Sequence, residues 1–394
     1  MKKIVKIAVF ILLAALAVSA VTGCGDNNGK DTETEMTTEK PTEKITETEQ
    51  ATEEPAPAGP TLRAVYPGTG EVVSLLTDEM TAWLAKYKPA KLDKIWDFTE
   101  KCEPVPLLLS WEDDGGALYS HVLVADNAGM ENAETYLVAG NSLLLEDLYS
   151  GQKYYWQIIS EREDKTVRSA VFGFETLYAP RTVAVDGVSN IRDMGGYLTE
   201  GGRRMKRGIV YRGADLTRVT EAGIDKMVRV YGIKTELDLR ERTNRGPSPL
   251  GKDINYVAVS APWYNWTFDE TYKEDLVKEL RVFADAENYP IFFHCSLGRD
   301  RTGTLAFLLE ALCGMSVEDI NKDYEVSFFS DTGGYNDNNA PSAVMNSFIA
   351  LRQSVQKYAK KESLSNAARA FLLSVGMTDA ELDAIVANLT EDVR

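Results

Sequence analysis

The chain is organised around the stretch Ile291-Phe292-Phe293-His294-Cys295-Ser296-Leu297-Gly298-Arg299-Asp300-Arg301-Thr302-Gly303. Its apolar start predicts a buried strand, its polar middle predicts a tight loop, and a helix is expected to begin near Thr302. Backbone N–H groups of such a loop converge on one point, and the following helix adds the positive end of its dipole. The stretch therefore predicts a binding site for a dianion, with a cysteine at the end of the strand and an arginine six positions later.

The residue types in this loop suit nucleophilic attack on phosphorus. The field at the loop stabilises a thiolate, the reactive form of Cys295. Arg301 offers a planar fork for two phosphate oxygens. We expect the loop to bind the remaining substrate oxygens through four residues, namely Ser296, Leu297, Gly298 and Arg299.

The pattern His-Cys-x5-Arg-Thr-Gly resembles the active-site signature of the cysteine-dependent protein tyrosine and dual-specificity phosphatases. Three upstream segments, at 190–196, 211–213 and 238–240, resemble the atypical bacterial tyrosine phosphatases that also act on phosphoinositides. The resemblance implies phosphoryl transfer through a cysteinyl-phosphate intermediate, without metal or cofactor. We interpret Asn-Ile-Arg-Asp-Met-Gly-Gly at 190–196 either as a turn locked by an Arg192–Asp193 pair or as a substrate contact.

The acid that protonates the leaving oxygen has two candidates. Asp300 lies inside the loop, where the resembling family carries its acid. Asp238 follows a strand that should lie beside the catalytic strand, but it could instead pair with Arg240 or Arg212. We favour Asp300. The resemblance also implies that Thr302 donates to the departing thiolate in the second step.

Basic residues near the loop bear on the substrate. Arg299 should add a second cation at the floor or rim of the pocket, where family members with a lysine accept phosphoinositides. Arg240 is expected at the ligand-facing end of its strand, as a substrate-binding residue. The predicted substrates are phosphotyrosine proteins and multiply phosphorylated inositols or phosphoinositides.

The two histidines, His121 and His294, fall in different predicted domains. This count argues against a Ser–His–Asp triad or a histidine-rich metal site. Strand neighbours point to opposite faces, so His294 should hydrogen-bond the loop from behind and not act as the base for Cys295.

The alternation of apolar and polar residues divides the folded part in two. Short alternating runs at 104–178 predict an all-β sandwich, and Tyr154 with its neighbours resembles the tyrosine corner of fibronectin type III domains. With an N-terminal extension this module covers 61–178. Alternating strands and helices at 180–394 predict an α/β cysteine-phosphatase domain with a mainly parallel central sheet flanked by helices.

The N-terminus predicts export. Residues 1–23 combine a basic start with a short apolar run, and Val-Thr-Gly before Cys24 resembles the lipobox of bacterial lipoproteins. Cys24 would then carry lipid, and the Thr/Glu/Pro-rich segment 24–60 would be a disordered tether. The alternative is an ordinary secretory signal. The predicted location is extracytoplasmic, on a membrane anchor.

Charge and cysteine content narrow the partners. The chain holds 43 basic and 60 acidic residues, which argues against nucleic acid as a partner. Residues 181–262 reverse the balance, as suits an anionic substrate. The other two cysteines, Cys102 and Cys313, predict no disulfide framework. Two alternatives stay open: a surface binding protein with an inactive phosphatase-like domain, and a sulfurtransferase, which Arg301-Thr302-Gly303 disfavours.

Overall fold

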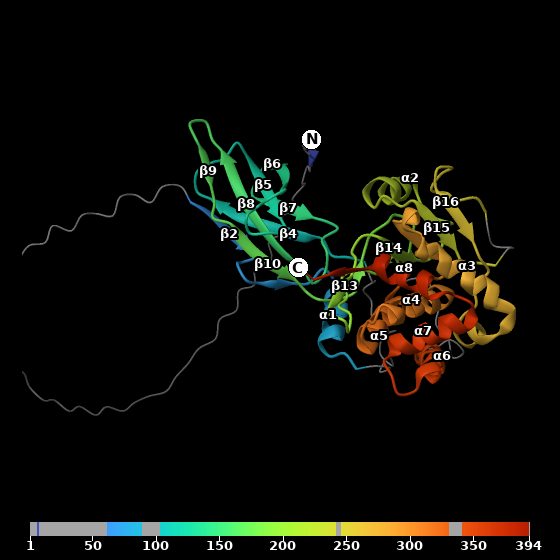
Figure 1. Ribbon diagram of the computed structural model, residues 1–394. Helices are drawn as coiled ribbons and strands as arrows, with labels where there is room; N and C mark the ends of the chain where they lie inside the picture. Colours follow the sequence, from blue (N-terminus) through green and yellow to red (C-terminus); the bar gives the residue numbers. More distant parts are fainter. Residues whose placement is uncertain (1–5, 8–60, 89–102, 242–245, 331–340, 394) are drawn as a thin grey trace, which may run out of the picture.

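The computed structural model describes residues 6–7, 61–88, 103–241, 246–330 and 341–393 (Figure 1). The predicted lipidation residue Cys24, the tether, Cys102 and nearly all of the signal segment lie outside these ranges. Across the described ranges, no helix combines the length and the apolar character needed to cross a bilayer.

The N-terminal module is a β-sandwich of two sheets. Because strand neighbours face opposite sides, Tyr154, Trp156 and Ile158 of one strand all turn into the space between the sheets. Trp156 meets Trp111 of the opposite sheet with ring centroids 6.4 Å apart. One sheet contains β6 (Glu134–Val138), β5 (Tyr119–Ala125), β8 (Lys153–Glu161) and β10 (Phe172–Thr176), with β9 (Thr166–Arg168), β3 (Val72–Val73) and β1 (Lys6–Ile7) beside them. The other contains β2 (Leu62–Tyr66), β4 (Leu107–Asp113) and β7 (Ser142–Leu145).

A tyrosine corner joins the two sheets, as the sequence predicts. The backbone N–H of Tyr149 donates to the hydroxyl of Tyr154 at 2.8 Å. The fibronectin type III identity itself stays a prediction.

The C-terminal domain is built on a mainly parallel sheet. Its strand order is β11 (Arg181–Thr182), β12 (Arg192–Asp193), β14 (Val210–Gly213), β17 (Ile291–His294), β15 (Thr235–Asp238) and β16 (Asn255–Ala258). The last four of these strands run parallel to one another. At one edge, β12 pairs antiparallel with β14, and β11 pairs antiparallel with β12. β15 pairs directly with β17, which confirms the predicted neighbour relation.

Helices cover both faces of this sheet because β17 is apolar on both. Phe293 packs into a core shared with the C-terminal helices, and Phe292 packs into a second core with Met227 on the opposite face. In Figure 1 the helices α4 to α8 gather on one side of the sheet and α2 lies on the other. The helices are α2 (Glu221–Asp225) continuing into η2 (Lys226–Val230), α3 (Lys273–Ala284), α4 (Asp300–Leu312), α5 (Val317–Val326), α6 (Pro341–Gln356), α7 (Leu364–Val375) and α8 (Asp379–Leu389). A small sheet pairs β13 (Arg203–Met205) with β18 (Thr390–Asp392).

One helix encoded before the sandwich packs on the phosphatase-like domain. In α1 (Asp78–Ala85), Met80 is fully buried in the core of the C-terminal domain. Trp83 contacts Phe329 with ring centroids 5.0 Å apart, and Figure 1 places α1 beside α5. The N-terminal extension that the sequence assigned to the sandwich is therefore shared between both domains.

Arginines of the C-terminal domain hold the tyrosine corner. Arg181 donates to the carbonyl oxygens of Asp147 and Leu148 at 2.6 and 3.0 Å. Its guanidinium also lies 4.2 Å from the centre of the Tyr149 ring. Arg207 donates to the carbonyl oxygens of Ser150 and Gly151.

Candidate active site

The predicted catalytic loop joins the end of β17 to the start of α4. Cys295 follows the last residue of β17 and is 4% exposed. The carbonyl of His294 accepts from the N–H of Leu239 at 2.8 Å, so the neighbouring strand fixes the start of the loop. The helix begins at Asp300, two residues earlier than predicted.

Three consecutive carbonyl groups of the loop are bound from the framework side. Those of Ser296, Leu297 and Gly298 accept from the Asp215 N–H, the Asn190 side chain and Arg212, at 3.4, 2.9 and 3.3 Å. In a trans peptide the C=O and the following N–H point in opposite directions. The amides of residues 297–299 therefore face away from the framework, beside the N-terminus of α4, and this arrangement favours an anion.

Glycine is required at Gly298 for two reasons. Its φ is +69°, and a Cβ there would lie 2.4 Å from the backbone carbonyl of Gly213. The loop therefore packs directly on the end of β14. Gly303 allows a second close approach, since a Cβ there would lie 2.6 Å from the ring of Tyr324.

A buried ion cluster supports the loop from behind. Arg192 and Arg212 both pair with Asp323, at 3.1 and 2.6 Å, and none of the three side chains is more than 1% exposed. Burial alone would raise the pKa of Asp323, but the two guanidiniums outweigh it and hold that pKa below its ordinary value. Arg192 also donates to Asn190, whose own side chain holds the loop.

These contacts correct two sequence expectations. Arg192 does not pair with Asp193, which instead forms an ion pair with Arg181 at 2.8 Å and accepts from the N–H groups of Gly195 and Gly208. Arg212, a possible partner of Asp238 in the sequence analysis, instead pairs with Asp323 and is buried beneath the loop. Segment 190–196 is thus a support for the loop and not a substrate contact, because Arg192 and Asp193 are both fully buried.

The Arg301 side chain lies at the rim of the loop. It donates to Glu241 at 2.8 Å, and its guanidinium lies 4.7 Å from the centre of the Trp263 ring. Glu241 is 57% exposed, so water screens this ion pair and makes it weak. A phosphate group with two negative charges would compete well with Glu241 for the guanidinium of Arg301.

Asp300 lies between a cation and a phenol. Arg299 donates to its carboxylate through Nε at 3.0 Å and through Nη2 at 3.3 Å, and the hydroxyl of Tyr264 donates to Oδ1. The Asp300 side chain is 28% exposed. The Arg299 side chain is only 8% exposed, so the predicted second cation of the rim is a buried partner of Asp300.

The other candidate acid, Asp238, is a structural carboxylate. It is fully buried, accepts from the N–H and guanidinium of Arg240, and accepts from the Tyr256 hydroxyl at 2.8 Å. Burial would raise the pKa of Asp238, but its hydrogen bonds with Arg240 and Tyr256 outweigh burial and lower that pKa. With no exposed surface, the Asp238 carboxylate does not face the space in which a substrate would bind. Asp238 is therefore a partner of Arg240, the alternative that the sequence left open, and the role of Arg240 in substrate binding stays a prediction.

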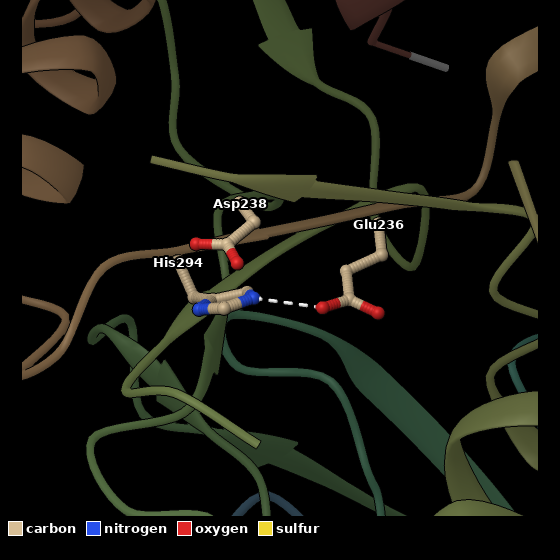
Figure 2. Close-up of side chains that lie close together, drawn as sticks. All are labelled: Glu236, Asp238 and His294. Atoms are coloured by element: carbon tan, nitrogen blue, oxygen red, sulfur yellow. Dashed lines mark hydrogen bonds and ion pairs between the residues drawn. The ribbon is translucent and has the colours of Figure 1, made fainter. Parts of the chain in front are cut away.

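His294 forms a cluster with two carboxylates behind the loop (Figure 2). Its Nε2 lies 3.0 Å from Oε1 of Glu236, and its Nδ1 lies 3.2 Å from the carbonyl oxygen of Cys295. Three such groups within 4.8 Å of one another could in principle hold a metal ion. Both ring nitrogens and both Asp238 oxygens are already hydrogen-bonded within the protein, so the cluster holds the backbone of Cys295 from behind, as the sequence indicates.

Thr302 sits in the first turn of α4 and is fully buried. Its hydroxyl has no hydrogen-bond partner among the described residues. A buried hydroxyl without a partner is unusual, and it frees Thr302 for a role in the reaction.

Comparison with known proteins assigns the family. The model described as "Tyrosine phosphatase family" matches residues 183–391, which is more than half of the 394 residues. The chain belongs to the tyrosine phosphatase family.

Relatives with tyrosine-protein phosphatase names match parts of this domain. One from Cupriavidus necator is 27% identical over 168 residues, covering 36% of this chain and 61% of the relative. One from Nostoc commune is 29% identical over 146 residues, covering 29% of this chain and 47% of the relative. The chain thus spans less than two thirds of the length of either relative. Among solved structures, the core catalytic domain of the PP-IP phosphatase Siw14 from S. cerevisiae aligns with 43% of this chain and 91% of its own, at 16% identity and a TM-score of 0.26.

Three residues of this tyrosine phosphatase site carry little or no signal in the sequence. Asp323 lies in α5, where its spacing from Arg192 and Arg212 carries no local signal. Glu241 follows Arg240, and nothing in the local sequence distinguishes it from other acidic residues. Tyr264 belongs to the dense aromatic run Trp263-Tyr264-Asn265-Trp266, which was the available signal for a residue near the pocket.

Proposed function

We propose that this tyrosine phosphatase hydrolyses phosphomonoesters without a metal ion, through a cysteinyl-phosphate intermediate on Cys295. The observation that carries the proposal is the orientation of the loop. Its carbonyls are bound to the framework, its amides face the other way, and α4 begins at the same place. That arrangement suits the equatorial oxygens of a phosphoryl group.

The chemistry then divides into two steps. Sγ of Cys295 attacks phosphorus in line, the P–O bond to the leaving group breaks, and Asp300 gives its proton to the leaving oxygen. Arg301 exchanges Glu241 for two phosphate oxygens. In the second step Asp300 takes a proton from water and the water oxygen bonds to phosphorus. The P–S bond breaks, Thr302 donates a hydrogen bond to the departing Cys295 thiolate, and inorganic phosphate is released.

The substrate class follows from the same residues. Phosphotyrosine in proteins fits a loop flanked by Trp263, and multiply phosphorylated inositols or phosphoinositides stay in the proposed range. Because Arg299 is committed to Asp300, extra phosphates would have to find other cations at the rim.

We place this activity outside the cytoplasm, on a lipid anchor at Cys24, with the β-sandwich between membrane and enzyme. This location rests on the sequence of residues 1–60 alone.

The direct test is turnover of a chromogenic aryl phosphate in the presence of a chelator. Wild-type protein should hydrolyse it, and Cys295→Ser should lose at least about a thousandfold in kcat, because a hydroxyl cannot replace the thiolate at neutral pH. Wild-type protein that is folded but inactive toward aryl phosphate, phosphopeptides and inositol phosphates would favour the alternative of a surface binding protein. Activity that persists in Cys295→Ser would contradict the mechanism.

A further inference from the structure

Tyr264 has an unusual backbone conformation and lies beside the catalytic loop. It opens the 3₁₀ helix η4 (Tyr264–Phe268), and its φ is +52°, a left-handed value that a bulky residue rarely adopts. Its backbone N–H donates to the hydroxyl of Thr304 on α4 at 3.0 Å. An aromatic residue held in this conformation needs a reason, and strained residues gather at functional sites.

Its hydroxyl links the acid to a second phenol. Tyr264 donates to Oδ1 of Asp300, and its oxygen is hydrogen-bonded to the hydroxyl of Tyr324. Since Tyr264 uses its proton on Asp300, Tyr324 must be the donor in the second bond. The chain of donors therefore runs from Tyr324 to Tyr264 to Asp300.

Packing fixes the far end of this chain. Tyr324 is 1% exposed, stacks on Phe348 with ring centroids 3.8 Å apart, and lies under Gly303. Burial raises the pKa of both Tyr264 and Tyr324, so both stay protonated over the working range. The neutral hydroxyl of Tyr264 therefore donates to Oδ1 of Asp300 throughout this pH range.

We propose that Tyr264 is a positioning residue for the general acid, and that Tyr324 positions Tyr264 in turn. Tyr264 and Nε of Arg299 both bind Oδ1, whereas Oδ2 accepts only the longer bond from Nη2 of Arg299 at 3.3 Å. Oδ2 is therefore the less tightly held oxygen and the one that carries the transferable proton. With Oδ1 anchored, Oδ2–H is held in one orientation toward the leaving oxygen. This role rests on the proposed function, in which Asp300 is the acid.

The test is the leaving-group dependence of Tyr264→Phe, measured in the full chain. Removing the hydroxyl should lower kcat on an alkyl phosphate by roughly tenfold, which is part of the rate enhancement that a general acid contributes. On an aryl phosphate with a good leaving group the loss should be under about threefold, because that group departs without a proton. KM should stay unchanged on both. Tyr324→Phe should act in the same direction, to a smaller extent.

A double mutant separates positioning from general damage. If Tyr264 acts through Asp300, Tyr264→Phe should have no further effect on alkyl phosphate turnover once Asp300→Asn is present. Tyr231→Phe is the matched control, since it removes a hydroxyl that donates to Asp147 at 2.7 Å, at the boundary between the domains. It should leave all rates unchanged.

The possible failures are distinct. Equal losses of Tyr264→Phe on both substrates, full additivity with Asp300→Asn, or rates equal to those of Tyr231→Phe would each overturn the positioning role. Wild-type protein that turns over no phosphate ester, or Cys295→Ser that keeps its activity, would instead overturn the proposed function itself.

Discussion

At the scale of single residues, the two candidate acids show how environment assigns chemistry to one residue type. Asp238 is surrounded by donors that bind its charged form and has no exposed surface. Asp300 keeps part of its surface exposed beside the catalytic loop. Sequence position made both plausible as the acid. Asp238 ends β15 and Asp300 begins α4, and both positions lie at the ligand side of the sheet. Both carboxylates accept from an arginine and a tyrosine, so exposure beside the loop, and not the kind of partner, distinguishes them.

The variant Asp238→Asn should therefore lose stability and not chemistry. Weakening a hydrogen-bonded buried charge costs about 1.5–3 kcal/mol, while alkyl and aryl phosphate turnover should fall by the same small factor. The folded pKa of Asp238 is lowered, so its contribution to stability is present above the unfolded pKa of about 3.9 and is lost as pH falls through the lower folded value.

Chemical unfolding of wild type and Asp238→Asn between pH 7 and pH 2.5 checks this sign. The difference in unfolding free energy should be constant near neutrality and should shrink below about pH 4. A difference that grows on acidification would contradict the lowered pKa. A loss confined to alkyl phosphate would return Asp238 to the role of acid.

At the scale of elements, the local sequence pattern predicted the strand, loop and helix of the site but not their long-range contacts. β17, the loop and α4 follow from one contiguous stretch whose apolar, polar and apolar parts each specify one structure. The partners of the loop come from far away: Asn190 lies 107 residues before Leu297, and Arg192 lies 131 residues before Asp323. No periodicity encodes such pairings, so the sequence could not predict that Arg192 and Arg212 pair with Asp323.

Gly298 offers a test of the loop as an element. Gly298→Ala adds a methyl group that meets the backbone of Gly213 at 2.4 Å, so the loop must move away from β14. We expect kcat/KM to fall by at least about a hundredfold, because a displacement of about 1 Å at a catalytic site has that effect.

Gly232→Ala is the matched control for this variant. Gly232 has a φ of +66°, close to that of Gly298, but no atom lies within 4 Å of its added Cβ. It therefore carries only the backbone cost, about 1 kcal/mol, and its kinetics should match wild type. If both variants lose activity equally, backbone strain and not loop packing governs the site.

At the scale of the whole molecule, the two domains are tied together by segments that the sequence assigned to one of them. The tyrosine corner of the sandwich rests on Arg181 and Arg207, and Arg181 also pairs with Asp193 of the supporting segment. α1 leaves the sandwich and packs on the phosphatase core. The boundary predicted near residue 180 therefore cuts through a shared core, which composition and turn signals could not reveal.

This sharing predicts which domain each buried residue stabilises. Met80 and Leu109 are both fully buried and both precede residue 180, but Met80 lies in the phosphatase core and Leu109 in the sandwich core. Truncating either to alanine should cost about 2–5 kcal/mol.

Met80→Ala should lower the temperature at which phosphatase activity is lost by roughly 2–4 °C per kcal/mol. Leu109→Ala should lower the unfolding temperature of the sandwich, which Trp111 and Trp156 fluorescence reports. Its effect on activity should be smaller. If Met80→Ala changes only the sandwich transition, α1 belongs to the sandwich alone, and a fragment starting at 180 would be as stable as one starting at 61.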